Sequence, residues 1–233
     1  MAIRNRLFSL IYRIIELGLG VYVLVFLFIS DKTDANVFQS FLYFSTEAMF
    51  LMVGIVFCEV ICNFVDLLKN GKDGLAAGVY MPLTLMGLTM VISDCLVYNI
   101  SSPFLGGYAL GQELFSVLLA HILMPIIFFL DYLLFDEKGT VKWKHVVIWL
   151  IYPLAYFTLI MVAHYIFKNN IYPYPFLNPN ALATSNEEIL SGNHGWNGSL
   201  IIISLMLLGF LLLGSFMIFL NNLLAHKYKR RIR

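Results

Sequence analysis

The sequence predicts an all-α integral membrane protein: a single domain of six transmembrane helices with both termini in the cytoplasm. Three observations predict this fold. The 233-residue chain is 60% hydrophobic and only 12% charged, its apolar residues form six long runs, and its cations gather in alternate loops. The mean hydropathy is +0.82. A soluble domain of this size could not bury so much apolar surface, so a membrane protein without a separate soluble domain is expected.

The six apolar runs each approach or exceed the roughly 20 residues that a bilayer core requires. The first follows Arg4 and Arg6, as a signal peptide would. It is too long for one and lacks a small-residue cleavage site, so we expect a retained span. The expected spans cover about 8–30, 39–67, 76–100, 113–135, 146–167 and 199–221.

Lysine and arginine residues predict the orientation of these spans. Twelve of them lie in the N-terminal segment, in the loops 68–75 and 136–145, and in the C-terminal tail, whereas the alternate loops hold only Lys32 and Lys168. By the positive-inside rule, both termini are then cytoplasmic and the loops 31–38, 101–112 and 168–198 face outward.

The fourth span, Gln112 to Phe135, carries a histidine in its middle, His121, with Pro125 four residues later. An ionisable side chain at this depth needs a partner or water. Proline has no N–H to offer the carbonyl group of residue i−4, which is His121 itself. A free carbonyl and an imidazole at one level of the helix predict a polar cavity, and we expect this cavity to be the functional centre.

Polar residues of the second span recur on one helical face, which is expected to point into the bundle: Glu59, Asn63 and Asp66 at i, i+4 and i+7. At about 100° per residue, Ser45 lies roughly 40° from Glu59 and Thr46 about 140° away. Ser45 is therefore expected to face inward, and Thr46 to face lipid or a neighbouring helix. These polar groups, with Asp131, form either a structural network or a functional one.

Three side chains from different spans share one level below the outer surface. Counting residues at 1.5 Å each puts Ser45, Asp94 and His121 about 10–14 Å deep, with His164 slightly shallower. A hydroxyl, an imidazole and a carboxylate are the groups that nucleophilic acyl transfer requires. Purely structural roles remain the alternative, because serines in membrane helices often bond to their own backbone. Arg13 and Glu16, at i and i+3, are expected to form a simple ion pair.

Three segments of the chain resemble the androgen-induced membrane protein family, including its bacterial branch: FLYFSTEAMF (41–50), AHILMPIIFFLDYLLF (120–135) and YPYPFLNP (172–179). The animal members are intramembrane hydrolases of fatty acid esters of hydroxy fatty acids, and they use a threonine and a histidine. The resemblance implies that His121 is the catalytic histidine. Matching Tyr43-Phe44 implies that Ser45 takes the nucleophile's position, while Thr46 keeps the family's residue type.

The sequence therefore predicts a bacterial multi-pass membrane protein that hydrolyses or transfers a lipid ester. Ser45 or Thr46 would be the nucleophile, His121 the base and Asp94 the orienting acid, and the expected substrate-binding residues are His164, Tyr43 and Tyr174. The YPYPFLNP segment, kept extended by its prolines, could close the cavity. We expect the partner to be a lipid substrate in the bilayer, with no cofactor, metal ion or nucleic acid.

Two other functions remain open. A metal-dependent lipid amidase or esterase would use His121, His164, Asp94 and Glu113, although no HxxxH pair is present. A small transporter or proton-coupled carrier would use buried carboxylates that mark ion pathways: Glu59, Asp66, Asp94 and Asp131.

Overall fold

The computed structural model describes residues 2–29, 41–101, 112–167, 172–174, 177 and 195–232. Side chains are described for all of these except 101, 112–114, 163–167, 195–198 and 226–232. The helices are α1 (Arg6–Ile29), α3 (Phe44–Asn70), α4 (Met81–Ser101), α5 (Gln112–Leu118), the π-helix η1 (Leu119–Leu123), α6 (Met124–Phe135), α7 (Lys144–Trp149), α8 (Ile151–Phe167) and α9 (Gly195–Ile232).

Six helical segments of the described chain are long and apolar enough to cross a membrane. The segments α5, η1 and α6 together form the fourth, and α7 with the start of α8 forms the fifth. No strand occurs in the described ranges, which hold only an isolated bridge between Asn5 and Asp73. The prediction of an all-α, six-helix membrane protein is confirmed.

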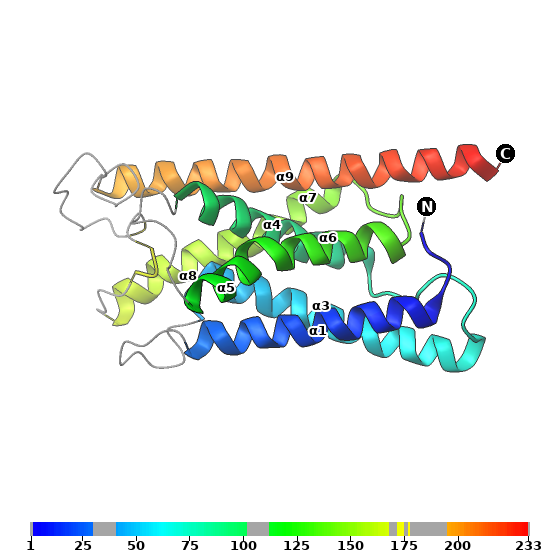
Figure 1. Cartoon of the computed structure of the whole chain (residues 1–233). Coiled ribbons are helices and arrows are strands. Elements are labelled where there is room, and N and C mark those ends of the chain that lie inside the picture. Colours follow the sequence, from blue (N-terminus) through cyan, green and yellow to red (C-terminus); the bar gives the residue numbers. More distant parts are fainter. Residues whose placement is uncertain are drawn as a thin grey trace.

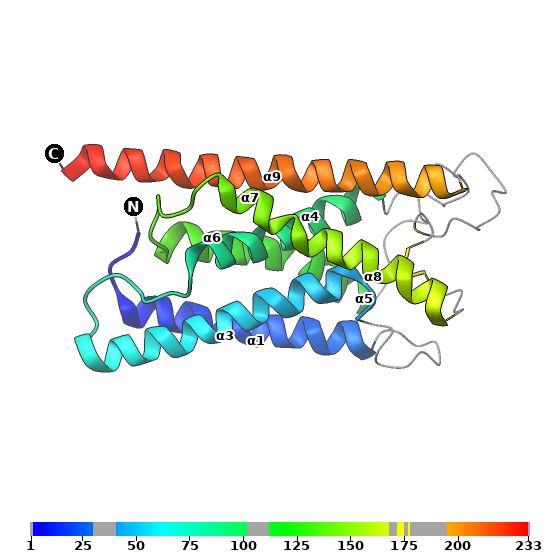
Figure 2. The same ribbon diagram turned by 180° about the vertical axis from the view of Figure 1, so that it is seen from behind.

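The helices form an elongated bundle with the two chain termini at the same end, called the terminal end below (Figure 1). The long helix α9 runs along one side, and α1 and α3 lie side by side on the other (Figures 1 and 2). Glycines allow close packing around α3. A Cβ atom at Gly20 of α1 would come within 2.7 Å of Val53, and one at Gly87 of α4 within 2.7 Å of Ile55. Helix α3 is therefore held between α1 and α4.

The observed boundaries differ from the expected ones at three places. Helix α3 begins at Phe44 instead of near 39, α4 begins at Met81 instead of 76, and α9 continues to Ile232 instead of ending at 221. The late start of α4 has a local cause. Pro82 suits the first turn of a helix. In the segment before Pro82, the Ala77 carbonyl accepts a hydrogen bond from Arg13 at 2.9 Å and so takes part in a contact outside α4.

Candidate active site

The fourth span changes its winding at His121. Residues Leu119–Leu123 form a π-helical turn immediately before Pro125. Such turns are rare and often occur at functional sites. The carbonyl oxygen of His121, expected to lack its usual partner, accepts a hydrogen bond from the Asn99 side chain of α4 at 3.3 Å. A side chain from a neighbouring helix therefore satisfies the disturbed backbone.

The imidazole of His121 lies against two side chains of α4. Its Nδ1 is 2.9 Å from Asp94 Oδ2, and its ring stacks on Tyr98 with centroids 3.8 Å apart and planes 5° from parallel. The side chains of His121 and Asp94 are only 10% and 14% exposed. Nε2 of His121 has no hydrogen-bond partner in the described part of the chain. Asp94 thus holds one edge of the imidazole ring, and Tyr98 covers one of its faces.

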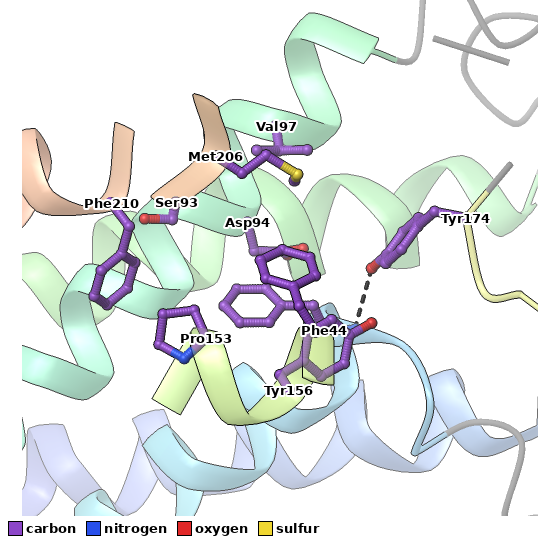
Figure 3. A pocket seen from close by; sticks show the side chains of 10 residues that line it. Phe44, Ser93, Asp94, Val97, Pro153, Tyr156, Tyr174, Met206 and Phe210 are labelled. Atoms are coloured by element: carbon purple, nitrogen blue, oxygen red, sulfur yellow. Dashed lines mark hydrogen bonds between the residues drawn. The ribbon is translucent and has the colours of Figure 1, made fainter. Parts of the chain in front are cut away.

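A small cavity of about 50 Å³ adjoins Asp94 (Figure 3). Its wall is largely apolar and comes from α3, α4, α8, α9 and the segment at Tyr174: Phe44, Ser93, Asp94, Val97, Pro153, Tyr156, Phe157, Tyr174, Met206 and Phe210. The Ser93 hydroxyl is buried, without a partner among the described residues. A space of this size holds a few water molecules or a carbonyl group.

The first turn of α3 lies at the edge of this cavity, beneath Tyr174 (Figure 3). The Phe44 N–H donates to the Tyr174 hydroxyl at 3.1 Å. Ser45, the next residue in this turn, lies close to the same hydroxyl. The Tyr43 ring contacts that of Tyr174 edge to face, with centroids 5.8 Å apart. Tyr174 thus caps the positive end of a long helix where a hydroxyl group is also present.

Ser45 and Thr46 lie on different sides of α3. Ser45 is half-buried and close to Tyr174, whereas Thr46 is 2% exposed. Thr46 is seven residues from Val53, which contacts Gly20, so it lies on the side of α3 that faces α1. The expectation that Thr46 could face lipid is wrong, and the alternative, a neighbouring helix, holds. Helix α3 begins only one residue before Ser45, which therefore lies in its first turn and not six residues into a span that starts at 39.

Several predicted positions lie outside the described part of the chain. The side chains of His164 and Glu113 are among them, as are residues 175, 176, 178 and 179 of the YPYPFLNP segment. Of this segment, Leu177 is fully buried and its N–H bonds to the carbonyl group of Tyr174 at 3.0 Å. No cluster of three or more His, Cys, Asp or Glu side chains that could hold a metal ion occurs among the described residues.

A second polar region lies nearer the terminal end and is called the ion cluster: Arg13, Glu16, Glu59, Asp131 and Asp136. Arg13 is 3.0 Å from Asp131, 2.8 Å from Asp136 and 3.4 Å from Glu59. The expected ion pair between Arg13 and Glu16 is wrong. Both Glu16 oxygens are buried without a hydrogen-bond partner in the described structure, because carboxylates from α3, α6 and the following segment take the guanidinium instead.

The other polar residues of α3 also lie toward the terminal end. Asn63 is fully buried and donates to the Ser9 hydroxyl at 2.6 Å. Asp66 is partly exposed and pairs with Arg6. Glu59 and Asn63 therefore face the bundle as predicted, whereas Asp66 lies at its rim.

Two residues of the His121 site were not singled out from the sequence, Tyr98 and Asn99. One signal could have found Tyr98, because it lies four residues after Asp94 and thus on the same face of α4. Asn99 bonds to a carbonyl group on another helix, and no residue spacing in the sequence indicates this contact.

Comparison of the chain with protein-family models, with curated proteins and with solved structures gives no match.

Proposed function

We propose that this protein is an intramembrane hydrolase or acyltransferase that acts on a lipid ester. In this proposal Ser45 is the nucleophile, His121 the general base and Asp94 the acid that orients the histidine. One observation carries the proposal: the 2.9 Å hydrogen bond between His121 Nδ1 and Asp94 Oδ2, inside an apolar helix bundle and next to a cavity. Ionisable residues in such positions mark functional sites more often than packing sites.

The bond to Asp94 favours the tautomer of His121 with the proton on Nδ1, which leaves Nε2 as an acceptor. Ser45 is not hydrogen-bonded to Nε2 in the described structure, so in the first step its hydroxyl would turn toward Nε2, which takes the proton while the oxygen attacks the ester carbonyl carbon. The C–O bond to the leaving alcohol then breaks, and that alcohol receives the proton from Nε2. Water repeats the sequence on the acyl-serine and releases a carboxylic acid; an acceptor alcohol in its place gives acyl transfer.

Ser45 is preferred to Thr46 because of its position on α3. Phe44 and Tyr174 both line the cavity, and Ser45 follows Phe44 in the turn that Tyr174 caps. Thr46 projects about 160° away from Phe44 around the helix, on the side facing α1. A nucleophile at Thr46 would need a change in the packing of α1 on α3.

The donors nearest Ser45 suit the negative charge that develops on the ester oxygen. The Phe44 N–H donates to the Tyr174 hydroxyl, at the N-terminus of a 27-residue helix. An oxyanion in this position would receive hydrogen bonds and a favourable helix dipole. In the absence of substrate, the Tyr174 hydroxyl takes that position; with substrate it would turn and donate to the oxyanion.

The size of the cavity bears on how the substrate binds. About 50 Å³ accommodates the reacting ester group but no acyl chain, since sites for larger ligands run to roughly 300 Å³ or more. The chain would therefore extend between α8 and α9 toward the bilayer, past Pro153 and Met206, which line the cavity. This route delivers the substrate from the membrane without passage through water.

A fluorophosphonate probe tests the proposal directly. Purified wild-type protein is expected to be labelled, and the Ser45→Ala and His121→Ala variants are expected to lose labelling while they remain folded. Thr158→Ala is the matched control, because its hydroxyl lies exposed on α8 and bonds only to its own helix at 2.7 Å. Undiminished labelling of either site variant would remove the proposal. Loss of labelling in Thr46→Ala, with Ser45→Ala still labelled, would transfer the nucleophile's role to Thr46.

A further inference from the structure

The ion cluster contains more acidic than basic side chains. It contains four carboxylates and the guanidinium of Arg13, and each of these residues is at most 3% exposed. The nearest further cation is Lys138, whose Nζ donates to the Asp136 carbonyl at 2.8 Å. If all of these groups were ionised, two negative charges would remain without a counter-ion. Such charges are so costly in a low-dielectric interior that carboxylates take up protons instead.

Asp131 is hydrogen-bonded at both oxygens, whereas Asp136 and Glu59 are each hydrogen-bonded at one oxygen and leave Oδ2 and Oε2 without a hydrogen bond in the described structure. Arg13 donates to both oxygens of Asp131, at 3.0 and 3.2 Å, and to Oδ1 of Asp136 at 2.8 Å. Glu59 accepts from the Thr84 hydroxyl at 3.1 Å and lies 3.4 Å from Arg13. These contacts favour the ionised form of Asp131 above all, because its two oxygens face the planar guanidinium together.

Glu16 differs from the other three. It is 1% exposed, and neither of its oxygens has a hydrogen-bond partner in the described structure. An ionised carboxylate in this state would lose all of its hydration and gain no hydrogen bond. We propose that the ion cluster is a proton-binding site, and that Glu16 holds a proton at neutral pH and releases it as the pH rises.

Groups from every neighbouring element set the charge around Glu16. Tyr12 and Arg13 lie on α1, Glu59 on α3, and Asp131 on α6. Asp136 and Lys138 belong to the segment after α6, and the Thr84 hydroxyl of α4 reaches Glu59. Gly78 lies against the cluster, since a Cβ atom there would be 3.6 Å from Asp136 and 3.9 Å from Glu59. The negative charges of Glu59, Asp131 and Asp136 therefore oppose the ionisation of Glu16. Arg13, which favours it, is already paired with those carboxylates.

A route for the proton leads from the terminal end. A cavity of about 540 Å³ lies there between the N-terminal segment, the end of α6 and α9, and its lining includes Asp136, Lys138 and Arg4. Asp136 thus belongs both to this cavity and to the ion cluster. Burial and the charge of Asp131 raise the pKa of Asp136 to about 6. Asp136 can therefore pass protons between cavity water and the cluster near neutral pH.

This proposal does not rest on the proposed hydrolase activity, because it concerns different side chains nearer the terminal end. Infrared spectroscopy of the intact protein in lipid vesicles tests it. The wild-type protein at pH 7 is expected to show the carbonyl band of a protonated carboxylic acid, which disappears as the pH is raised. In Glu16→Gln this band should lose the intensity of one group. Asp66→Asn, which alters a partly exposed carboxylate paired with Arg6, should leave the band unchanged.

The stability of the same variant gives a second readout. Glutamine closely resembles a protonated glutamic acid but cannot ionise on unfolding, whereas an unfolded glutamate ionises above about pH 4.3. The unfolding temperatures of the wild type and Glu16→Gln should therefore agree at pH 4, and the wild-type value should fall progressively below that of the variant as the pH rises to 7. Absence of the band in the wild type, its full persistence in Glu16→Gln, or failure of this variant to fold would each overturn the proposal.

Discussion

The two polar regions of this bundle differ in how their charges are compensated. In the ion cluster, Arg13 is fully buried and contacts carboxylates from three separate segments. At the other site, His121 and Asp94 form a single pair that is 10–14% exposed and adjoins a cavity. The many buried contacts of the ion cluster hold helices together. The His121–Asp94 pair lies next to a cavity, and its geometry leaves Nε2 of the imidazole ring available for a reaction. Similar residue types thus serve different purposes because of their surroundings.

The same helices carry both regions. Glu59 is fourteen residues after Ser45 on α3, about 21 Å along the helix, and Asp131 is ten residues after His121, about 15 Å. Thr84 and Asp94 on α4 are likewise ten residues apart. The contacts of the ion cluster therefore fix the positions of α3, α4 and α6 relative to one another. Reactive groups need placement to within a fraction of an ångström, so the cluster supports the site from a distance.

Asp94→Asn is expected to have the largest effect on activity and a small one on stability. The amide can bond to His121 but favours the wrong tautomer, which in serine hydrolases costs about 10⁴-fold in turnover. The rate of labelling by the fluorophosphonate probe measures the loss, and thermal unfolding measures the stability. A rate within a few-fold of wild type would show that Asp94 has only a packing role.

Arg13→Met is expected to have the largest effect on stability. Removal of the cation leaves several buried carboxylates without compensation, at a cost of about 3–5 kcal/mol in the free energy of unfolding. The comparison variant is Arg6→Met, which removes the partly exposed pair with Asp66 and hydrogen bonds to the carbonyl groups of residues 70, 71 and 73, and it is expected to lose less stability than Arg13→Met. Chemical denaturation in detergent gives both values. Equal losses in the two variants would contradict the distinction between a closed cluster and a rim pair.

Tyr174→Phe separates a role in catalysis from a role in capping. Loss of a donor to the oxyanion lowers turnover by about 10²–10³-fold, whereas loss of the hydroxyl that caps α3 costs only about 1 kcal/mol of stability. The two effects are read from labelling rates and from thermal unfolding. Destabilisation with unchanged turnover would leave Tyr174 as a helix cap alone.

Asn99→Ala has the smallest expected effect. It leaves the His121 carbonyl without its partner, at a cost of about 1–3 kcal/mol in the free energy of unfolding. Pro125→Ala supplies a new N–H nearby, so the cost of Asn99→Ala should shrink in that background. A double-mutant cycle measures this coupling. Additive losses would mean that Pro125 is not the reason why Asn99 is needed.

The sequence predicted the helical framework well because apolar runs of membrane length have few alternatives. It also predicted that His121 needs a partner and that Glu59 and Asn63 face inward, since both follow from helical periodicity and the cost of burying polar groups. The partners themselves were harder to predict. Arg13 pairs with Asp131 on α6 and with Asp136 just after it, both more than a hundred positions away, and no local spacing signals such a choice over Glu16.

The start of α3 shows a second limit. A run of apolar residues indicates where a span can lie, but Tyr174, distant in the sequence, caps the N–H group of Phe44. The helix begins later than hydropathy suggests, and Ser45 lies in its first turn. Helical periodicity separates Ser45 from Thr46 around α3, whereas the neighbour of each side chain depends on how α1 and Tyr174 pack.

Peptide mapping of the fluorophosphonate adduct by mass spectrometry would identify the nucleophile. We expect a single modified residue, Ser45, in the wild-type protein and no adduct at that position in His121→Ala. An adduct on another residue, or an adduct on Ser45 that forms equally fast without His121, would contradict this expectation.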